Sequence, residues 1–299
     1  MTHYCAVLGD PIDHSLSPAL HEAAYRQLGL DGWEYRKVRV NEQELKPWLE
    51  SLTPQWAGLS LTMPLKRTIV PYGTLRDRWS QTLGVANTAV LRWDGGHKPS
   101  IGLYNTDVFG IAQAFAHAHE TAPSTCRTPR TALILGNGNT AASAVAACAS
   151  MGVASVTVAA RHVRANDAME RIMREHAGTL RMVALDSEAA LEALADSDVV
   201  VNTIPAGFAQ PVADMLAASG VQVRGMLLDV IYGAGFSSLR SVYRSRGGLF
   251  VDGRDMLLYQ ALAQVLLMTG VTDPLESGVY RLPNNMGTLE QAMRHAIYR

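Results

Sequence analysis

Three groups of residues have types and spacings that could do chemistry. Lys66 follows a predicted buried strand at 57–63, and α/β proteins bind their ligands at the carboxyl ends of such strands. Ser15 and Ser17 are two hydroxyls beside a predicted helix start, where they could bind a small carboxylate. The third group is the glycine turn GNGNTA at 136–141. Each has a plainer interpretation: a solvated surface lysine, a helix cap, and a turn that holds no ligand.

The glycine turn stands between a predicted strand, 131–135, and an alanine-rich helix. This order opens a dinucleotide-binding βαβ unit. Gly136 permits the tight turn, Gly138 lets the backbone approach a pyrophosphate, and Ala141 allows close packing of helix on strand. Free N–H groups at the helix start would bind the phosphates. The predicted cofactor contacts are Gly136, Asn137, Gly138, Asn139, Thr140 and Ala141.

The composition favours a folded enzyme over a nucleic-acid or membrane protein. Of the 299 residues, 48% are hydrophobic and 18% charged, which is enough for the cores of two domains. The net charge is −1 with no basic or acidic run, which argues against binding nucleic acid or an anionic membrane. There is no long apolar run and no signal-peptide profile, and the three cysteines form no C-x-x-C, so a reduced cytoplasmic protein is expected. The nine histidines form no H-E-x-x-H and no Cys/His cluster, so no metal is expected.

A doubly wound α/β fold is predicted for the second part of the chain. Strands and helices alternate there, which predicts a parallel sheet with right-handed crossovers. In the first part, Ser17 is expected to cap a helix over 19–28, and Gly110 to open a helix over 111–119. The strands of the second part are expected at 131–135, 155–159, 181–185, 198–202, 226–231 and 249–252.

Seven blocks of residues follow one another along nearly the whole chain. They correspond to the patterns G-x-P-x-x-H-S-x-S-P at 9–18, N-V-T-x-P-x-K at 60–66, G-A-x-N-T at 84–88, N-T-D at 105–107, N-T-x-P-x-G at 202–207, D-x-x-Y at 229–232 and G-x-x-M-L-x-x-Q at 253–260. In these blocks and in their order the chain resembles the shikimate dehydrogenases. Three departures from the family pattern are Ser60 for Asn, Glu22 for Asn and Leu103 for Gly; after Tyr232, Ala234, Ser237 and Ser238 replace the usual proline and threonine-proline.

The resemblance implies reversible hydride transfer between a nicotinamide and a ring alcohol, converting shikimate to 3-dehydroshikimate. Lys66 would exchange the proton of the reacting hydroxyl, and Asp107 would hold and tune the lysine. Ser15 and Ser17 would bind the substrate carboxylate. The other ring hydroxyls would be bound by Thr62, Asn87, Tyr232 and Gln260.

The resemblance also implies two domains and a monomer or homodimer. Residues 1–109 with 256–299 would form the substrate-binding catalytic domain, and 110–255 a Rossmann-like domain that binds NADP. Thr203 and Gly253 would join the glycine turn in holding the cofactor.

The segment after the second strand of the Rossmann-like domain predicts NADP rather than NAD. An NAD site carries an acidic residue there for the ribose 2′-hydroxyl, whereas this chain has Arg161, His162 and Arg164 and no carboxylate before Asp167. Guanidinium groups bind a 2′-phosphate bidentately, so Arg161 and Arg164 are the predicted clamp. The family's N-R-T is missing at this turn, and the alternative is that both arginines are exposed helix-start charges.

Two other functions fit parts of the pattern. The chain could be a quinate/shikimate dehydrogenase, but in that branch a threonine tends to replace the second serine, and Ser17 favours shikimate. It could also be a dinucleotide-binding regulator without catalysis. Lys66 and Asp107 argue against a regulator, because a sensor does not need a proton-transfer pair.

Overall fold

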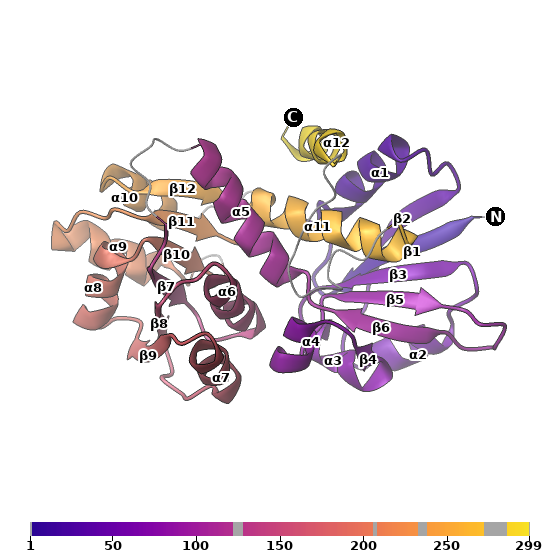
Figure 1. Ribbon diagram of the computed structural model, residues 1–299, viewed down its shortest axis with the longest axis horizontal. Coiled ribbons are helices and arrows are strands. Elements are labelled where there is room, and N and C mark those ends of the chain that lie inside the picture. Colours follow the sequence, from indigo (N-terminus) through magenta and orange to yellow (C-terminus); the bar gives the residue numbers. More distant parts are fainter. Residues whose placement is uncertain (1, 122–127, 206–207, 233–237, 272–285, 299) are drawn as a thin grey trace. The chain divides into compact units, whose positions relative to one another are not determined.

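The computed structural model describes residues 2–121, 128–205, 208–232, 238–271 and 286–298. The chain forms two compact units, one from 1–110 with 257–299 and the other from 111–256. Each unit is built on its own six-stranded sheet with helices packed against it (Figure 1). The predicted α/β class, with a mixed α/β first domain and a doubly wound second domain, is confirmed.

The first sheet has the order β2-β1-β3-β5-β6-β4. β1 pairs in parallel with β2 and β3, whereas β5 runs antiparallel to β3 and to β6. Because β3 and β6 both run antiparallel to β5, their carboxyl ends lie at one edge of the sheet. The strands are β1 (His3–Gly9), β2 (Trp33–Arg39), β3 (Trp56–Leu61), β4 (Thr74–Leu75), β5 (Thr88–Arg92) and β6 (Ser100–Tyr104).

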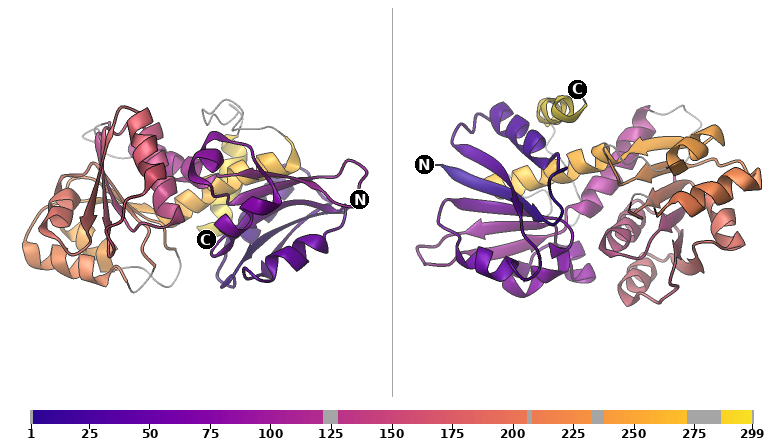
Figure 2. Two further views of the ribbon diagram at one scale, coloured as in Figure 1. Left: turned by 90° about the horizontal axis from the view of Figure 1, so that it is seen from below. Right: turned by 180° about the vertical axis from the view of Figure 1, so that it is seen from behind.

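Helices cover both faces of this first sheet. Cys5 and Val7 of β1 pack with α1, α11 and α12, while their neighbours Ala6 and Leu8 pack on the opposite side with α2 and α3. Side chains alternate along a strand, so a continuous apolar run is buried only when both faces are covered. α1 and α12 lie side by side (Figure 2). The helices are α1 (Ser17–Gln27), α2 (Leu45–Glu50), α3 (Leu65–Thr68), the 3-10 helix η1 (Val70–Tyr72), α4 (Arg78–Leu83), α11 (Gly253–Thr269) and α12 (Gly287–Ile297).

The second sheet is wholly parallel, with the order β12-β11-β10-β7-β8-β9. Counted from β7 this is 3-2-1-4-5-6, the order of dinucleotide-binding folds. Its strands are β7 (Thr131–Leu135), β8 (Ser155–Ala160), β9 (Thr179–Ala184), β10 (Val199–Asn202), β11 (Met226–Asp229) and β12 (Leu249–Asp252). Its helices are α5 (Asp107–Thr121, which begins in the first unit), α6 (Asn139–Ser150), α7 (Asp167–Glu175), α8 (Glu188–Asp196), α9 (Gln210–Ser219) and α10 (Ser238–Ser245).

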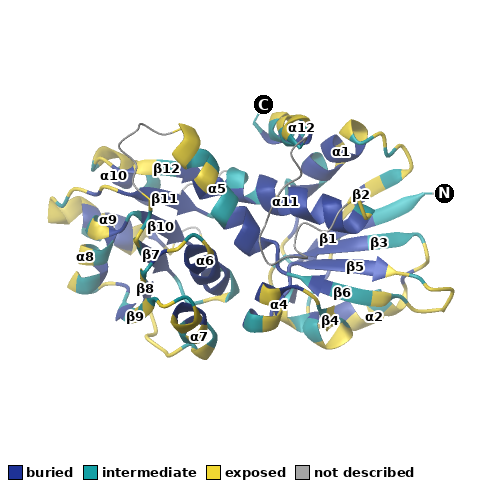
Figure 3. Ribbon diagram, viewed as in Figure 1, coloured by how far each residue is buried: buried dark blue, intermediate teal, exposed yellow. Residues whose placement is uncertain are grey.

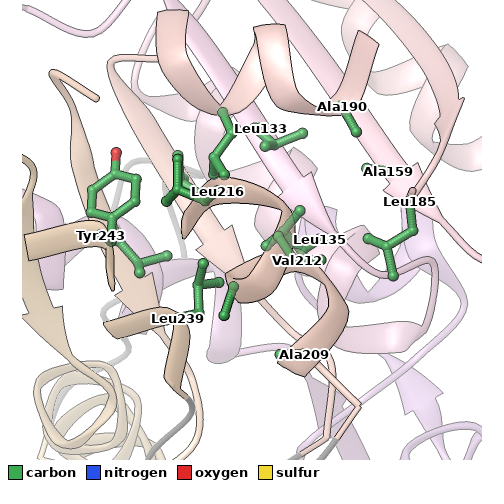
Figure 4. Close-up of a cluster of buried hydrophobic side chains, with 14 of the residues drawn as sticks. Leu133, Leu135, Ala159, Leu185, Ala190, Ala209, Val212, Leu216, Leu239 and Tyr243 are labelled. Atoms are coloured by element: carbon green, nitrogen blue, oxygen red, sulfur yellow. The ribbon is translucent and has the colours of Figure 1, made fainter. Parts of the chain in front are cut away.

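The central strands of both sheets are largely buried (Figure 3): β1, β3 and β5 in the first sheet, and β7, β8, β10 and β11 in the second. On one face of the second sheet, Leu133 and Leu135 of β7 meet Leu216 of α9 and Tyr243 of α10 (Figure 4). This apolar cluster fixes β7, and therefore the turn that follows it, at the centre of the sheet.

Two predicted helix starts are wrong. Ser17 is not the N-cap of the first helix: Leu16 takes that position, and the Ser15 hydroxyl accepts the Ser17 N–H. The helix starts early because the Leu16 carbonyl already accepts the Leu20 N–H. Likewise α5 begins at Asp107 rather than after Gly110, because the Thr106 carbonyl accepts the Gly110 N–H.

Several short elements were not predicted: α3, α4, α10, β4 and η1. They are too short for an apolar period to show, and α4 is fixed by a side chain instead. The Asp77 carboxylate accepts the N–H groups of Trp79 and Ser80 at the start of α4. Four residues of the family pattern, Ala206, Gly207, Ala234 and Ser237, lie outside the described residues.

In the part of the chain that the structure describes, no helix is long and apolar enough to cross a membrane. In the same residues no group of three or more His, Cys, Asp or Glu side chains is placed to hold a metal ion.

We predict that Asp77→Ala lowers the free energy of unfolding of the first unit by about 2–4 kcal/mol, because it uncaps α4 and leaves the buried Asn105 N–H without its acceptor. All five tryptophans lie in the first unit, so their fluorescence during urea unfolding reports on it alone. Asn166→Ala removes an equivalent cap from α7 in the second unit and is the control. Equal shifts of the tryptophan transition in both variants would contradict the prediction.

Candidate active site

The two predicted catalytic residues form an ion pair. Lys66 Nζ lies 2.5 Å from Asp107 Oδ2, and the side chains are only 16% and 7% exposed. Lys66 is on α3, just after β3, and Asp107 opens α5, just after β6. The shared edge of the sheet at which these strands end therefore brings together residues that are 41 positions apart in the sequence.

The second oxygen of Asp107 is bound by Asn87. Asn87 Nδ2 donates to Asp107 Oδ1 at 2.8 Å and lies 3.3 Å from Gln260 Oε1. Asn87 Oδ1 accepts the N–H of Thr106 at 2.8 Å. Four predicted site residues are thus gathered in one hydrogen-bonded cluster, with both carboxylate oxygens of Asp107 engaged.

The backbone around the ion pair is held by further hydrogen bonds. The Lys66 carbonyl accepts the Ala86 N–H at 2.8 Å. Asp77 Oδ1 accepts the Asn105 N–H at 3.0 Å, and Asn105 Oδ1 accepts the Asp107 N–H at 3.2 Å. Burial raises the pKa of Asp77, with the hydrogen bonds from α4 and Asn105 opposing that effect. The loop that carries Asp107 is therefore tied to the start of α4.

The remaining predicted substrate residues lie in two places. Thr62 is half-buried just after β3, and a side chain at Gly9 would come within 2.3 Å of its methyl group, so the start of the serine loop adjoins the end of β3. Ser15 is half-buried and Ser17 is buried at the start of α1. Tyr232 is half-buried after β11 and belongs to the second unit.

The glycine turn follows β7, beside the end of β10, where the strand order of the second sheet reverses. Gly136 has a φ of +110°, and a Cβ there would lie 2.5 Å from Thr203 Oγ1. Thr203 Oγ1 in turn donates to the Leu135 carbonyl at 2.7 Å. Ligands of doubly wound sheets bind at such a switch point, and the structure places the predicted cofactor residues Gly136 and Thr203 together there.

Gly138 shows that the turn has room for a ligand. Its φ of −95° suits any residue, and no protein atom lies within 4 Å of the position of a Cβ. Neither backbone conformation nor protein packing requires glycine here. A pyrophosphate approaching the exposed start of α6 would require it, so the turn fits a dinucleotide. Buried Ala141 lies behind it on α6, after half-buried Asn139 and Thr140.

Gly253 has a different reason to be glycine. A Cβ there would lie 2.4 Å from the Asp229 carbonyl oxygen, so close packing of α11 against the end of β11 accounts for it. Its contact with a cofactor stays a prediction.

The arginine segment lies on the loop after β8, beside the glycine turn. Asn137 Nδ2 donates to the Arg164 carbonyl at 3.4 Å and thereby ties this loop to the turn. Arg161 and Arg164 are exposed, and the Arg161 guanidinium lies 5.3 Å from the ring centre of Phe208. Phe208 is not among the predicted site residues, although it is an aromatic residue directly after the N-T-x-P-x-G block.

A Rossmann-like sheet with a glycine turn at its switch point, together with a shielded lysine–aspartate pair, defines a dinucleotide-dependent oxidoreductase. The family profile of the "Shikimate dehydrogenase substrate binding domain" matches residues 7–89. The Shikimate dehydrogenase (NADP(+)) of Methanosarcina mazei is 31% identical over 282 residues, which cover 92% of this chain and 96% of that protein. The chain belongs to the shikimate dehydrogenase family.

Solved structures agree with this assignment. The crystal structure of Mycobacterium tuberculosis shikimate dehydrogenase has a TM-score of 0.80 and 34% identity, with 99% of this chain and 100% of that chain covered. Shikimate 5-dehydrogenase from Thermus thermophilus, solved in complex with shikimate, has a TM-score of 0.72 and 25% identity, with 99% of each chain covered.

The two glycines of the turn should respond differently to alanine. We expect Gly138→Ala to weaken NADP binding by about tenfold or more, because the methyl group occupies the approach of the pyrophosphate, while stability changes by only about a few tenths of a kcal/mol. Gly136→Ala should lower stability by about 1–3 kcal/mol, because of its positive φ and the contact with Thr203. Calorimetric titration with NADP and thermal unfolding measure the two effects. Unchanged NADP affinity in a folded Gly138→Ala protein would contradict the proposed pyrophosphate site.

Proposed function

We propose that this protein catalyses the reversible NADPH-dependent reduction of 3-dehydroshikimate to shikimate. The observation that carries the proposal is the shielded Lys66–Asp107 pair, which stands in a cluster of amide groups at one edge of the first sheet. The first unit binds the substrate and the second binds NADP. Relatives named as NADP(+)-dependent shikimate dehydrogenases support this function.

In this proposal Lys66 exchanges the proton. As the ring carbonyl is reduced, its oxygen must gain a proton, and Lys66 Nζ donates it; in the reverse direction Nζ accepts the proton of the hydroxyl. Bound NADPH supplies the hydride. Asp107 Oδ2 orients Nζ, while Asn87 holds the other carboxylate oxygen and prevents the carboxylate from turning. The lysine therefore meets the substrate from a fixed position.

Hydroxyl and amide side chains bind the rest of the ring in this proposal. Ser15 and Ser17 bind the carboxylate with two neutral hydroxyl donors at the start of α1. Ser17 in place of the threonine that is typical of the quinate branch favours shikimate. The ring hydroxyls are bound by Thr62, Asn87, Gln260 and Tyr232. Such a site rejects related compounds, because a wrong ligand leaves buried polar groups unpaired.

The cofactor is held by main-chain groups and by positive charge. The turn at 136–141 binds the pyrophosphate at the start of α6, and Thr203 and Gly253 join it in contacting NADP. Arg161 and Arg164 bind the 2′-phosphate, with His162 as a third donor. Both guanidinium groups are exposed on the loop that adjoins the turn, so they are available to a phosphate.

We propose further that the enzyme is cytoplasmic and works as a monomer or homodimer. Cys5 and Cys148 are free thiols in the core, and burial raises the pKa of each to about 12. Such thiols resist oxidation because the reactive thiolate is disfavoured.

Lys66→Ala should remove turnover without removing the fold. We expect kcat for shikimate to fall by about 10²–10⁴-fold, because a positioned acid/base group is lost. Asp107→Asn should show a similar fall. Steady-state assays with shikimate and with quinate, each with NADP and with NAD, measure the changes and test the substrate choice.

The control for this test is Lys46→Ala. Lys46 also pairs with a carboxylate, Glu50 at 4.0 Å, but it is exposed on α2, and its loss should leave kcat unchanged. If kcat of Lys66→Ala stays within about threefold of the parent, the lysine is not the proton-exchanging group.

Arg161 should determine the preference of the enzyme for NADP over NAD. We expect the parent to prefer NADP to NAD by at least about tenfold in kcat/KM, which corresponds to about 1.4 kcal/mol. Arg161→Ala should erode this ratio and leave the NAD reaction nearly unchanged, because only NADP carries the 2′-phosphate. Arg174→Ala, an exposed arginine at the end of α7, is the control. Equal use of NAD and NADP by the parent enzyme would overturn the assignment.

A further inference from the structure

Behind Asn87 lies a group of polar side chains that the proposed mechanism does not use. Ser60, Thr88 and Gln264 are 4%, 0% and 1% exposed, and Tyr35 beside them is 5% exposed. Buried polar groups are expensive unless they are hydrogen-bonded, and each of these has partners. We propose that Thr88 and Gln264 are positioning residues that fix the side-chain amide of Asn87. This inference rests on the proposed role of Asn87 beside the Lys66–Asp107 pair.

The orientation of the Gln264 amide is set by one neighbour that can only accept. Gln264 Nε2 lies 3.2 Å from the Asn87 carbonyl oxygen, which has no proton to give. The NH2 group must therefore face Asn87, and Oε1 faces Ser60, whose hydroxyl donates to it at 2.8 Å. Gln264 lies one helical turn after Gln260 on α11, so it fastens that helix to β3 and β5 directly behind the site.

Ser60 links Tyr35 to Gln264 by accepting one hydrogen bond and donating another. The Tyr35 hydroxyl donates to Ser60 Oγ at 2.6 Å, and the single proton of Ser60 is committed to Gln264. Ser60 stands where the family pattern has asparagine, and here a hydroxyl both accepts and donates. The chain of donors therefore begins at Tyr35 on β2.

Thr88 links Gln264 to Asn87 and thereby fixes which way the Asn87 amide faces. Its hydroxyl accepts from Gln264 Nε2 at 3.0 Å and donates to Asn87 Oδ1 at 2.9 Å. Asn87 Oδ1 also accepts the Thr106 N–H. If the Asn87 amide were reversed, its NH2 group would face two donors and its oxygen would face the Asp107 carboxylate. Only the observed orientation delivers a donor to Asp107 Oδ1, which leaves Oδ2 for Lys66.

All bonds of this donor chain point toward the Asp107 carboxylate. Successive hydrogen bonds with one direction polarise and strengthen one another in a low-dielectric interior. His21 adjoins the chain, with its ring stacked on Tyr35 at 3.8 Å and Nε2 at 3.4 Å from Gln264 Oε1. Burial lowers the pKa of His21 to about 3, so the ring is neutral at working pH and places no charge behind the carboxylate.

The first test is Thr88→Val, which keeps the branched shape of the strand residue and removes only the hydroxyl. We expect kcat for 3-dehydroshikimate to fall about tenfold with KM for NADPH unchanged, because Asn87 Oδ1 loses one of the donors that fix its amide and keeps the Thr106 N–H. Thr88→Ser restores the hydroxyl and should return kcat to within about threefold of the parent. Tyr35→Phe removes the first donor, keeps the ring on His21, and should lower kcat about threefold.

The matched control is Tyr25→Phe. Tyr25 is a buried tyrosine whose hydroxyl lies 3.5 Å from His21 Nδ1, at the limit of a hydrogen bond, so it reaches Gln264 only through His21 and donates to no member of the donor chain directly. Its removal should leave kcat within about twofold of the parent, whatever its effect on thermal unfolding.

A measurement that does not depend on turnover tests this inference separately from the proposed function. NMR exchange of the Asn87 side-chain amide protons in the whole chain should be slow in the parent and in Thr88→Ser, and fast in Thr88→Val and Tyr35→Phe. A parent without 3-dehydroshikimate reductase activity would overturn the proposed function, while amide exchange would still decide the donor chain. The inference is overturned if the amide stays protected in Thr88→Val or Tyr35→Phe, or if Thr88→Ser loses as much activity as Thr88→Val. It is equally overturned if Tyr25→Phe lowers kcat as much as Tyr35→Phe does.

Discussion

The first unit depends on keeping one shielded carboxylate paired. Asp107 is 7% exposed, and its charge would be strongly destabilising without partners at both oxygens. Lys66 engages one oxygen and Asn87 the other. The two partners are not equivalent: the lysine is charged and meets the substrate in the proposed reaction, whereas the asparagine is neutral and holds the carboxylate still. A pair of this kind adds little to stability, so its presence in a buried cluster indicates chemistry.

The fold meets this requirement by converging chain segments at one sheet edge. The ends of β3 and β6 bring Lys66 and Asp107 together, the start of β5 supplies Asn87, and α11 returns from the far end of the sequence with Gln260 and Gln264. Because these segments are distant in the sequence, a displacement of any one strand end would separate a donor from its acceptor. The apolar layers on both faces of the sheet prevent such displacement.

The sequence predicted the secondary-structure elements better than it predicted the hydrogen bonds between distant side chains. The strand-and-helix alternation and the glycine turn were sufficient for the doubly wound sheet, since both are local patterns. Ser17 was wrongly expected to cap α1, because backbone geometry decides which residue takes the N-cap position, and the structure places Leu16 there. The bond between Ser60 and Gln264 joins residues 204 positions apart, and no local pattern contains it. Its direction depends further on the carbonyl of Asn87, which only three-dimensional structure reveals.

Three glycines of the second unit show that some glycines are required by the fold and others by a ligand. Gly136 is required by its positive φ and by Thr203, and Gly253 by the Asp229 carbonyl, so the protein itself explains both. Gly138 has an ordinary φ and open space around it, so the protein leaves it unexplained. A glycine that neither its φ nor the packing of the protein requires indicates that a ligand must approach the backbone closely at that position. Of these three glycines, Gly138 is therefore the one whose identity argues for a bound dinucleotide, whereas the other two argue only for the fold that presents it.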